Sequence, residues 1–365
     1  MNRMVAGGAE TTALELVRAL HGRGIDFVVA TMYDGGELQD RFLATGAAVH
    51  PRLAGGKVAP LAPIRVARLV RREAIDAVIV LDISRNVLVY GLIGAGLSLR
   101  RVPKILWCHA IPGGNCDDFT NRLKFLRMLG SPDVIVCVGR HQRRVLAARG
   151  FSRRRMPLIR NGLDLAKFPA AARAEGIAPA GKRLIVQVGN WVFYKDQPTL
   201  IRAAGLLARR RGDFHVALVG RGTDGSEAVE LVRRHQAEGC VSLLGQRGDV
   251  PAVLSAADIF VMATRCEVLN VATLEAMASG LPVVVSDVPG FDDLLKDGVE
   301  GLKTPPGDSE ALAAALERLL DDPSLRQRLA AAARRRSRRF SVSRMATDFR
   351  RLLETLCGRG RKKGL

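Results

Sequence analysis

Apolar and polar positions along the chain alternate between two kinds of segment. Short apolar runs, many of them rich in β-branched residues, predict buried strands. These runs lie at residues 27–29, 76–81, 104–109, 134–138, 184–188, 214–219, 241–244, 258–262 and 283–285. The stretches between and after them predict helices, among them 87–97, 141–149, 271–279, 309–320, 324–339 and 342–356. Because strands alternate with helices, the pattern predicts an α/β protein with parallel sheets and right-handed crossovers.

The first predicted helix begins beside two glycines, Gly7 and Gly8, and Gly22 is placed to end it. Glycines before a helix allow backbone N–H groups to approach a phosphate closely, so both are candidate phosphate-binding residues. Only residues 1–6 precede them, which is too few for a strand of about 5 or 6 residues and its loop. We therefore expect the first strand to be short or absent.

One strand-loop-helix-strand unit, residues 258–289, carries two carboxylates in a polar context. Glu267 follows the strand, and Glu275 lies eight positions later in a helix that begins near Val271 and ends at Gly280. Ligands of parallel sheets bind beyond the carboxyl ends of the strands, and a helix N-terminus suits a phosphate. Carboxylates accept hydrogen bonds from ribose and sugar hydroxyls. The unit therefore favours a nucleotide-sugar site.

The formal net charge of +20 indicates an anionic partner. Anionic substrates and an anionic membrane surface fit this charge, and an arginine-rich composition bias is the alternative. Nucleic acid is disfavoured, because aromatic residues make up only 5% of the chain and no DNA-reading motif occurs.

No run approaches the roughly 20 apolar residues of a transmembrane helix, and the N-terminus lacks a signal pattern. The expected location is therefore cytoplasmic, with peripheral contact at the inner face of the cytoplasmic membrane. The six cysteines show no paired close spacing, so we expect reduced thiols and no zinc site.

The central unit resembles the donor-binding signature of glycosyltransferase family 4, whose members are retaining enzymes of GT-B fold. That signature is Glu, seven residues, Glu, and then Ala-Met-Ala-x-Gly-x-Pro-Val-Val. In this chain it is Glu267 followed by Glu275-Ala276-Met277-Ala278-Ser279-Gly280-Leu281-Pro282-Val283-Val284. The resemblance covers residues 7–356.

The resemblance implies two Rossmann-like parallel-sheet domains that face a central cleft. Residues 1–164 would form the N-terminal, acceptor-binding domain and 165–340 the C-terminal, nucleotide-sugar-binding domain. Residues 341–365 would form a last helix that crosses back to the N-terminal domain, followed by a basic tail.

Roles for single residues also follow from the resemblance. The catalytic residues would be His109, Lys195 and Glu267. Lys195 would stabilise the donor diphosphate, Glu267 would hold the donor sugar, and His109 would reach a sugar hydroxyl. Glu275 would hold the ribose. The donor-binding residues would be Gly7, Gly8, Asn190, Lys195, Gln246, Arg247, Glu267, Leu269, Asn270, Val271 and Glu275.

The chain departs from the family pattern at two places. Asn190 stands where relatives commonly carry an arginine that binds the diphosphate. The loss of this cation would weaken stabilisation of the leaving group unless another arginine compensates. Val268 replaces a glycine after Glu267, and Asn270 stands three positions after that Glu instead of four. A backbone that needs positive φ at position 268 would be strained by valine, so we expect the phosphate loop to differ locally.

The implied function is a retaining transferase that moves a hexosyl group from a nucleotide sugar to a glycan or a lipid-linked acceptor. Such transfer would serve the synthesis of surface polysaccharide or glycolipid. UDP is favoured as the nucleotide because it is frequent among relatives. No Asp-x-Asp triplet occurs, in agreement with a metal-independent GT-B enzyme, and we expect no cofactor. The alternatives are a catalytically weak or inactive nucleotide-sugar-binding protein and a nucleotide-sugar epimerase.

A short basic amphipathic segment in the first domain is a candidate for contact with the acceptor. Its apolar residues are Phe119, Leu123, Leu126 and Met128, and its basic residues are Arg122, Lys124 and Arg127. Our hypothesis is that this segment meets an anionic membrane that holds a lipid-linked acceptor. An ordinary packed helix with a solvated basic face is the alternative.

Overall fold

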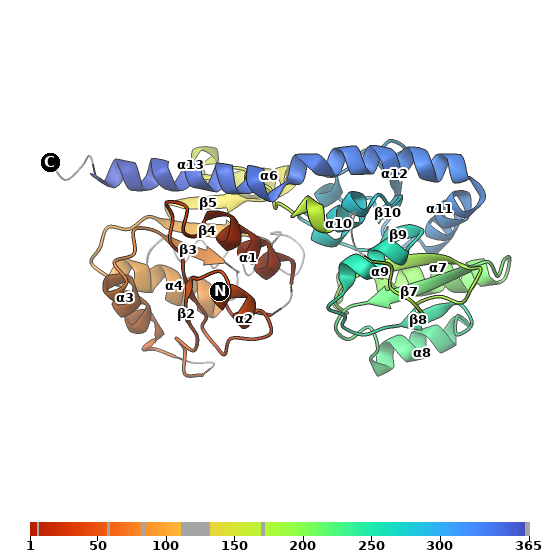
Figure 1. Cartoon of the computed structure of the whole chain (residues 1–365), viewed down its shortest axis with the longest axis horizontal. Coiled ribbons are helices and arrows are strands. Elements are labelled where there is room, and N and C mark those ends of the chain that lie inside the picture. Colours follow the sequence, from red (N-terminus) through yellow and green to blue (C-terminus); the bar gives the residue numbers. More distant parts are fainter. Residues whose placement is uncertain (6, 57–58, 82–84, 111–131, 169–171, 362–365) are drawn as a thin grey trace. The chain divides into compact units, whose positions relative to one another are not determined.

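A computed structural model of the protein describes residues 1–5, 7–56, 59–81, 85–110, 132–168 and 172–361. The chain divides into two units. The first comprises Met1–Leu163 together with Val342–Leu365, and the second comprises Asp164–Ser341. The chain therefore leaves the first unit once and returns to it for its last helix (Figure 1).

The first unit contains two parallel sheets. Strands β1 and β2 pair with each other, and β3, β4 and β5 form a separate sheet in that order. The elements of the unit are α1 (Gly8–Leu20), β1 (Val28–Ala30), α2 (Gln39–Leu43), β2 (Ala48–His50), α3 (Ala62–Arg72), β3 (Val78–Leu81), α4 (Arg85–Leu97), β4 (Lys104–Cys108), β5 (Val134–Cys137), α6 (Arg140–Ala148), η1 (Arg153–Arg155) and α13 (Val342–Arg361).

The N-terminal segment runs beside the chain that follows β1 without forming a regular strand. The backbone N–H of Met32 donates to the carbonyl of Met1 at 3.1 Å, and that of Met4 donates to the carbonyl of Gly35 at 2.6 Å. No strand is assigned within residues 1–5, and the next described residues lead into α1. This confirms the prediction that the first strand is short or absent.

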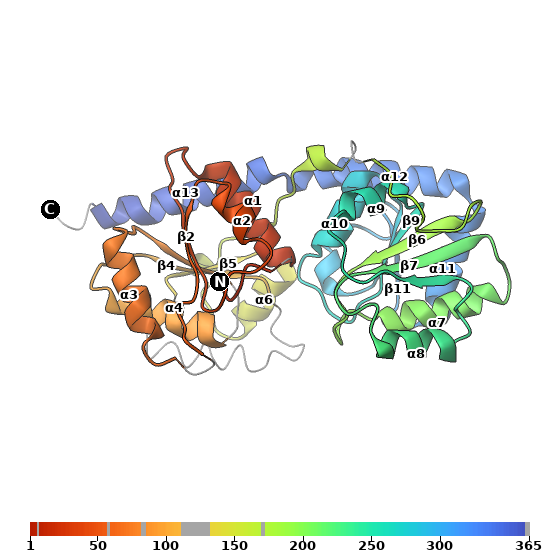
Figure 2. The same cartoon turned by 60° about the horizontal axis from the view of Figure 1, so that its bottom comes forward.

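The second unit is a six-stranded parallel sheet with the order β11-β10-β9-β6-β7-β8. Helices α7, α8 and α11 cover one face, and α9, α10 and α12 cover the other (Figure 2). The elements are η2 (Leu165–Lys167), β6 (Arg183–Val188), α7 (Gln197–Ala208), β7 (Phe214–Val219), α8 (Ser226–Arg234), β8 (Val241–Leu243), α9 (Val250–Ala256), β9 (Ile259–Met262), α10 (Val271–Ser279), β10 (Val283–Ser286), η3 (Pro289–Phe291), β11 (Leu302–Thr304), α11 (Ser309–Asp321), α12 (Pro323–Ser337) and η4 (Arg338–Phe340).

Central strands of the second unit are buried on both faces, which explains why they are continuous apolar runs in the sequence. All residues of β7, β9 and β10 are buried. Alternate side chains of these strands, among them Val216, Val261 and Val284, pack with apolar residues of α7, α11 and α12 in one core. The strands that the apolar runs predicted are therefore confirmed within a few residues.

Both ends of α10 lie where the sequence places them. The helix begins after Asn270, whose side-chain oxygen accepts a hydrogen bond from the Thr273 N–H at 2.7 Å. It ends at Gly280, which adopts φ 80° and so occupies the left-handed region that glycine tolerates. The two caps fix the helix between the β9 loop and strand β10.

The last helix, α13, packs against α1 in the first unit. Phe349 on α13 lies edge-on to Trp107 of β4, with ring centroids 4.5 Å apart, and both side chains are fully buried. The Gly162 N–H also points to the sulfur of Met345 at 3.3 Å. The final helix thus completes the core of the first unit.

Within the described part of the chain, no helix combines the length and the apolar character needed to cross a membrane. The amphipathic segment 119–128, for which membrane contact was predicted, lies outside the described residues.

Candidate active site

The carboxyl edge of the six-stranded sheet gathers most of the predicted site residues. Because the six strands are parallel, the loops that follow β6, β7, β8 and β9 leave the sheet at the same edge. Asn190 and Lys195 follow β6, Gln246 follows β8, and Glu267 follows β9. This is the edge at which α/β sheets bind ligands.

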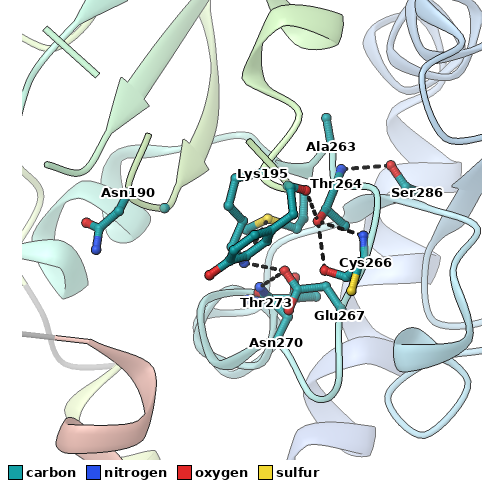
Figure 3. A network of polar contacts seen from close by, with 12 residues as sticks. Asn190, Lys195, Ala263, Thr264, Cys266, Glu267, Asn270, Thr273 and Ser286 are labelled. Atoms are coloured by element: carbon teal, nitrogen blue, oxygen red, sulfur yellow. Dashed lines mark hydrogen bonds and ion pairs between the residues drawn. The ribbon is translucent and has the colours of Figure 1, made fainter. Parts of the chain in front are cut away.

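Lys195 and Glu267 form an ion pair at this edge, although they are far apart in the sequence (Figure 3). The Lys195 ammonium group donates to Oε1 of Glu267, and only 14% and 10% of the two side chains are exposed. The same Oε1 accepts a second hydrogen bond from the Asn270 amide at 2.9 Å. Three predicted site residues therefore meet in one polar cluster, which we call the Lys195–Glu267–Asn270 cluster.

Asn270 has two tasks that its side-chain amide performs together. Its oxygen caps α10 at the Thr273 N–H, and its nitrogen donates to Glu267. The amide orientation is set by these two partners, because an N–H donor needs the oxygen and a carboxylate needs the nitrogen. The helix cap thereby fixes the position of the carboxylate.

The loop that carries Glu267 is held on both sides. The Thr264 N–H donates to the Ser286 hydroxyl at 2.9 Å, and the Thr264 hydroxyl donates to the Tyr194 carbonyl at 2.7 Å. Gly290 approaches the loop so closely that a Cβ there would lie 2.1 Å from the Glu267 carbonyl oxygen. The backbone beneath the carboxylate therefore has little freedom to move.

Val268 does not bring strain to this loop. It is not one of the described non-glycine residues that adopt a positive φ, and its side chain is 8% exposed. The neighbouring Leu269 is 6% exposed, and Val271 is the first residue of α10. The chain thus replaces the family's glycine by a packed apolar residue in an ordinary backbone conformation.

Glu275 lies on α10 and has a different environment from Glu267. Burial raises the pKa of its carboxyl from 4.5 to about 7, and the charge of Lys167 acts in the opposite direction. Among the contacts of the described residues, the hydrogen bonds and ion pair that join Lys195, Glu267 and Asn270 do not include Glu275. Its carboxyl is poised between two protonation states near neutral pH.

Asn190 and Gln246 both lie against Arg221, a residue that the sequence analysis did not single out. The Asn190 side-chain oxygen accepts a hydrogen bond from the Arg221 N–H at 3.1 Å. The Arg221 guanidinium donates to Gln246 Oε1 at 3.2 Å. Arg221 follows β7 in Gly220-Arg221-Gly222, and the glycine turn directly after a strand was the available sign.

Arg247, the other predicted basic residue of this edge, already has an acidic partner. Its guanidinium makes two hydrogen bonds to the carboxylate of Asp249, at 2.8 and 2.6 Å. These bonds raise the pKa of Arg247 and lower that of Asp249. A ligand phosphate would have to compete with this carboxylate for the guanidinium.

The glycine loop of the first unit also lies beside an acidic group. Gly7 is the N-cap of α1, and a Cβ at this position would lie 2.7 Å from a carboxylate oxygen of Glu10. Gly8 is the first helical residue. The carboxylate already occupies the space over Gly7 and carries the charge that a helix N-terminus favours.

His109 directly follows β4 in the first unit. Burial lowers the pKa of its imidazole to about 3, so the ring is neutral at physiological pH. Its Nε2 is buried and has no hydrogen-bond partner among the described residues, and Trp107 lies 5.0 Å away by ring centroids. A buried nitrogen without a partner is costly unless a ligand or water completes its hydrogen bonding.

Within the described ranges, no three His, Cys, Asp or Glu side chains are grouped in a way that could hold a metal ion. Among the described cysteines, Cys137 and Cys240 are buried free thiols.

Comparisons with known families agree with the two-unit arrangement. Residues 6–167 match the family model described as glycosyltransferase family 4, and residues 170–336 match that described as glycosyl transferases group 1.

Two similar relatives differ in how much of the chain they match. The lipopolysaccharide core biosynthesis glycosyltransferase LpsE of Rhizobium meliloti is 30% identical over 329 residues, which cover 89% of this chain and 88% of that protein. Glycogen synthase of Mycobacterium tuberculosis is 33% identical over 181 residues, or 49% of this chain. That match spans only 43% of the synthase, less than half its length.

Among solved structures, HepE from Anabaena in complex with UDP-glucose has a TM-score of 0.83 to this chain. The alignment covers 96% of this chain and 97% of that one, at 21% sequence identity. At this identity the likeness establishes the shared fold.

Proposed function

Because the chain belongs to glycosyltransferase family 4 and has its GT-B fold, we propose that it transfers a hexosyl group from a nucleotide sugar with retention of anomeric configuration. The donor would be a UDP-sugar and the acceptor a glycan or a lipid-linked saccharide. The product would belong to a surface polysaccharide or a glycolipid.

The Lys195–Glu267–Asn270 cluster carries this proposal. It supplies one cation and one carboxylate, both partly buried, at the edge of the sheet where a ligand would lie. An ammonium group can stabilise negative charge on a departing diphosphate. A carboxylate can accept hydrogen bonds from sugar hydroxyls. The cluster therefore offers one group for the sugar and one for the diphosphate of the donor.

The proposed mechanism needs no protein nucleophile. The donor phosphate itself would take the proton of the acceptor hydroxyl as the new glycosidic bond forms on the face from which the diphosphate departs. His109 would act as a neutral hydrogen-bonding partner of a sugar hydroxyl, because its low pKa excludes a charged imidazolium. Glu275 would accept hydrogen bonds from the ribose hydroxyls. Neither a metal ion nor another cofactor is part of the proposal.

The nature of donor and acceptor is supported by two relatives. The HepE structure similar to this chain contains UDP-glucose, and LpsE acts in lipopolysaccharide core biosynthesis. We therefore propose a UDP-sugar as donor and an acceptor of the lipopolysaccharide or glycolipid class. A cytoplasmic protein with peripheral contact to an anionic membrane is consistent with such an acceptor.

A catalytically weak donor-binding protein is the second candidate. Asn190 is favourable to this alternative, because it brings no charge to a position where relatives carry a cation. Its amide oxygen is instead bound to the Arg221 backbone. The two candidates differ in turnover and agree in nucleotide binding.

The test is a transfer assay on the full chain with UDP-, GDP- and ADP-sugars and lipopolysaccharide-core or glycolipid acceptors. We expect release of the nucleoside diphosphate to depend on acceptor, to persist in EDTA, and to give a product with retained anomeric configuration by NMR. Lys195→Ala should lower turnover by orders of magnitude, whereas Lys296→Ala, at an exposed lysine of the same unit, should leave it unchanged. If nucleotide sugars bind but no donor–acceptor pair is turned over, the weak binding protein is favoured. If no nucleotide binds, both candidates are refuted.

A further inference from the structure

The Lys195–Glu267 ion pair has a consequence for which nucleotide the site retains. We propose that this pair makes the site discriminate against the nucleoside diphosphate that remains after transfer and in favour of the intact nucleotide sugar. The inference rests on the proposed function, because it assumes that a sugar diphosphate binds at the Lys195–Glu267–Asn270 cluster.

The two charges of the cluster neutralise each other within the protein. Lys195 donates to Glu267, with further neighbours in the sulfur of Met262 at 3.9 Å and the ring of Tyr194 at 5.9 Å. Both charged side chains are at least 86% buried, since 14% and 10% of them are exposed. Water is therefore poorly placed to replace either partner, and separating a buried pair leaves a charge without compensation.

A ligand that offers only phosphate can satisfy one member of the pair. To bind the diphosphate, the Lys195 ammonium group must turn from Glu267 towards the phosphate oxygens. Among the described residues, Glu267 would then keep the Asn270 amide as its one donor. The favourable interaction of Lys195 with phosphate is offset by the ion pair that Glu267 loses. Binding of a nucleoside diphosphate is therefore weakened.

An intact nucleotide sugar can satisfy both members together. Its diphosphate draws Lys195, and its sugar hydroxyls donate to the Glu267 carboxylate that the lysine has left. The same buried carboxylate thus weakens binding of the nucleoside diphosphate and holds the nucleotide sugar. A site gains specificity in this way when it makes binding of the wrong ligand unfavourable. After transfer the sugar has gone, and return of Lys195 to Glu267 favours release of the diphosphate.

The structure indicates which partner moves. Gly290 packs against the backbone of Glu267, and Asn270 ties the carboxylate to the N-terminus of α10. Lys195 has four methylene groups between its backbone and its charge, and it follows β6 in a loop of its own. We infer that the lysine exchanges partners while the carboxylate stays in place.

Three other described cations at this edge have partners of their own. Arg247 is held by Asp249 through two hydrogen bonds, and Arg265 lies 3.6 Å from the buried carboxylate of Asp196. Arg221 is bound to Gln246 and is exposed. If Arg221 alone bound the phosphates, the ion pair would remain intact and the proposed discrimination would disappear, which gives the test a clear competing outcome.

The test is calorimetric titration of the full chain with UDP, UDP-glucose, GDP and GDP-mannose. In Glu267→Gln the carboxylate charge is gone, so Lys195 is no longer held by an ion pair. We expect the diphosphate to bind about tenfold more tightly than to the wild type, while the nucleotide sugar binds no more tightly. Removal of a carboxylate proposed to hold the donor would thus improve binding of the product. Glu267→Ala is the second variant, with folding checked by circular dichroism.

Glu317→Gln is the matched control. It also removes one carboxylate from an ion pair, with Arg210 at 3.1 Å on the surface of the same unit. Its affinities for both ligands should stay within about twofold of the wild type, which excludes a general effect of net charge.

The failures of the two proposals are distinguishable. If the wild type binds none of the four nucleotides, the proposed donor site is refuted together with this inference. If the wild type binds them and neither Glu267 variant tightens diphosphate binding, only the inference is overturned.

Discussion

Replacing Glu275 by glutamine tests the protonation state of the α10 carboxyl. Burial raises the pKa of this group from 4.5 to about 7, so the folded protein holds its proton more tightly than the unfolded chain does. The pKa difference between 4.5 and about 7, at about 1.4 kcal/mol per pH unit, gives an upper bound of about 3 kcal/mol for the pH-dependent contribution of Glu275 to the free energy of unfolding. The side chain keeps some exposed surface, so we expect about half of this value.

The sign of the effect follows from the raised pKa. Below pH 4.5 the carboxyl is protonated in both states, and its contribution to stability is fully present. That contribution is lost as the pH rises through about 7, because ionisation is disfavoured only in the folded protein. The free energy of unfolding of Glu275→Gln, minus that of the wild type, should therefore increase by about 1.5 kcal/mol between pH 4.5 and pH 8.

Urea unfolding followed by tryptophan fluorescence measures this difference. The chain has two tryptophans, Trp107 in the first unit and Trp191 in the second. In a Trp107→Phe background, Trp191 reports on the unit that contains Glu275. Comparing variant and parent at each pH cancels the titration of all other groups.

Lys167→Met provides the control, because the charge of Lys167 lowers the pKa of Glu275. Its removal should extend the pH-dependent loss of stability to higher pH, and only while Glu275 is present. The reasoning is refuted if the free energies of unfolding of Glu275→Gln and its parent differ by the same amount at every pH.

Three further predictions concern single residues. The pKa of His109 is lowered to about 3, so its contribution to stability is present above pH 6.5 and lost towards pH 3; His109→Gln should lessen the decline in unfolding free energy between pH 6.5 and pH 4. Asn270→Ala should cost about 1 kcal/mol through loss of the α10 cap, seen in urea unfolding, and should weaken nucleotide-sugar binding because Glu267 loses a donor. Gly290→Ala should abolish nucleotide binding in calorimetry by displacing the Glu267 loop, whereas Gly212→Ala, where a Cβ meets open space, should not.

The sheet order could not be read from the apolar runs, but the positions of the strands could. Runs such as 258–262 and 283–285 are continuous because both faces of these strands are covered, and this is a local property of the sequence. The ends of α10 were also predictable, since glycine at position 280 and a polar residue at 270 act on their own backbone.

The partners of the site residues depend on distant parts of the chain and were not predictable. Lys195 was expected to bind phosphate, and nothing near it in the sequence indicates that Glu267, 72 positions later, is its partner. The neutral state of His109 likewise depends on its burial in the folded protein. Their proposed roles towards a donor stay predictions.

Val268 shows how a departure from the family pattern predicts a local change in the backbone. Valine would be strained if the loop kept a positive φ here, so its substitution for glycine predicted a local difference in the loop. The structure has an ordinary φ at this position and a buried side chain instead. A backbone without positive φ at this position agrees with the prediction that the loop differs locally from the family pattern.

The return of α13 to the first unit determines the order in which the protein can fold during synthesis. The second unit is one continuous segment, Asp164–Ser341, and can acquire its whole core as soon as that segment has left the ribosome. The first unit begins earlier but must wait for Phe349 to cover Trp107. The half of the protein that is translated first is therefore completed last, and a nascent chain stalled before Val342 would expose an unfinished core.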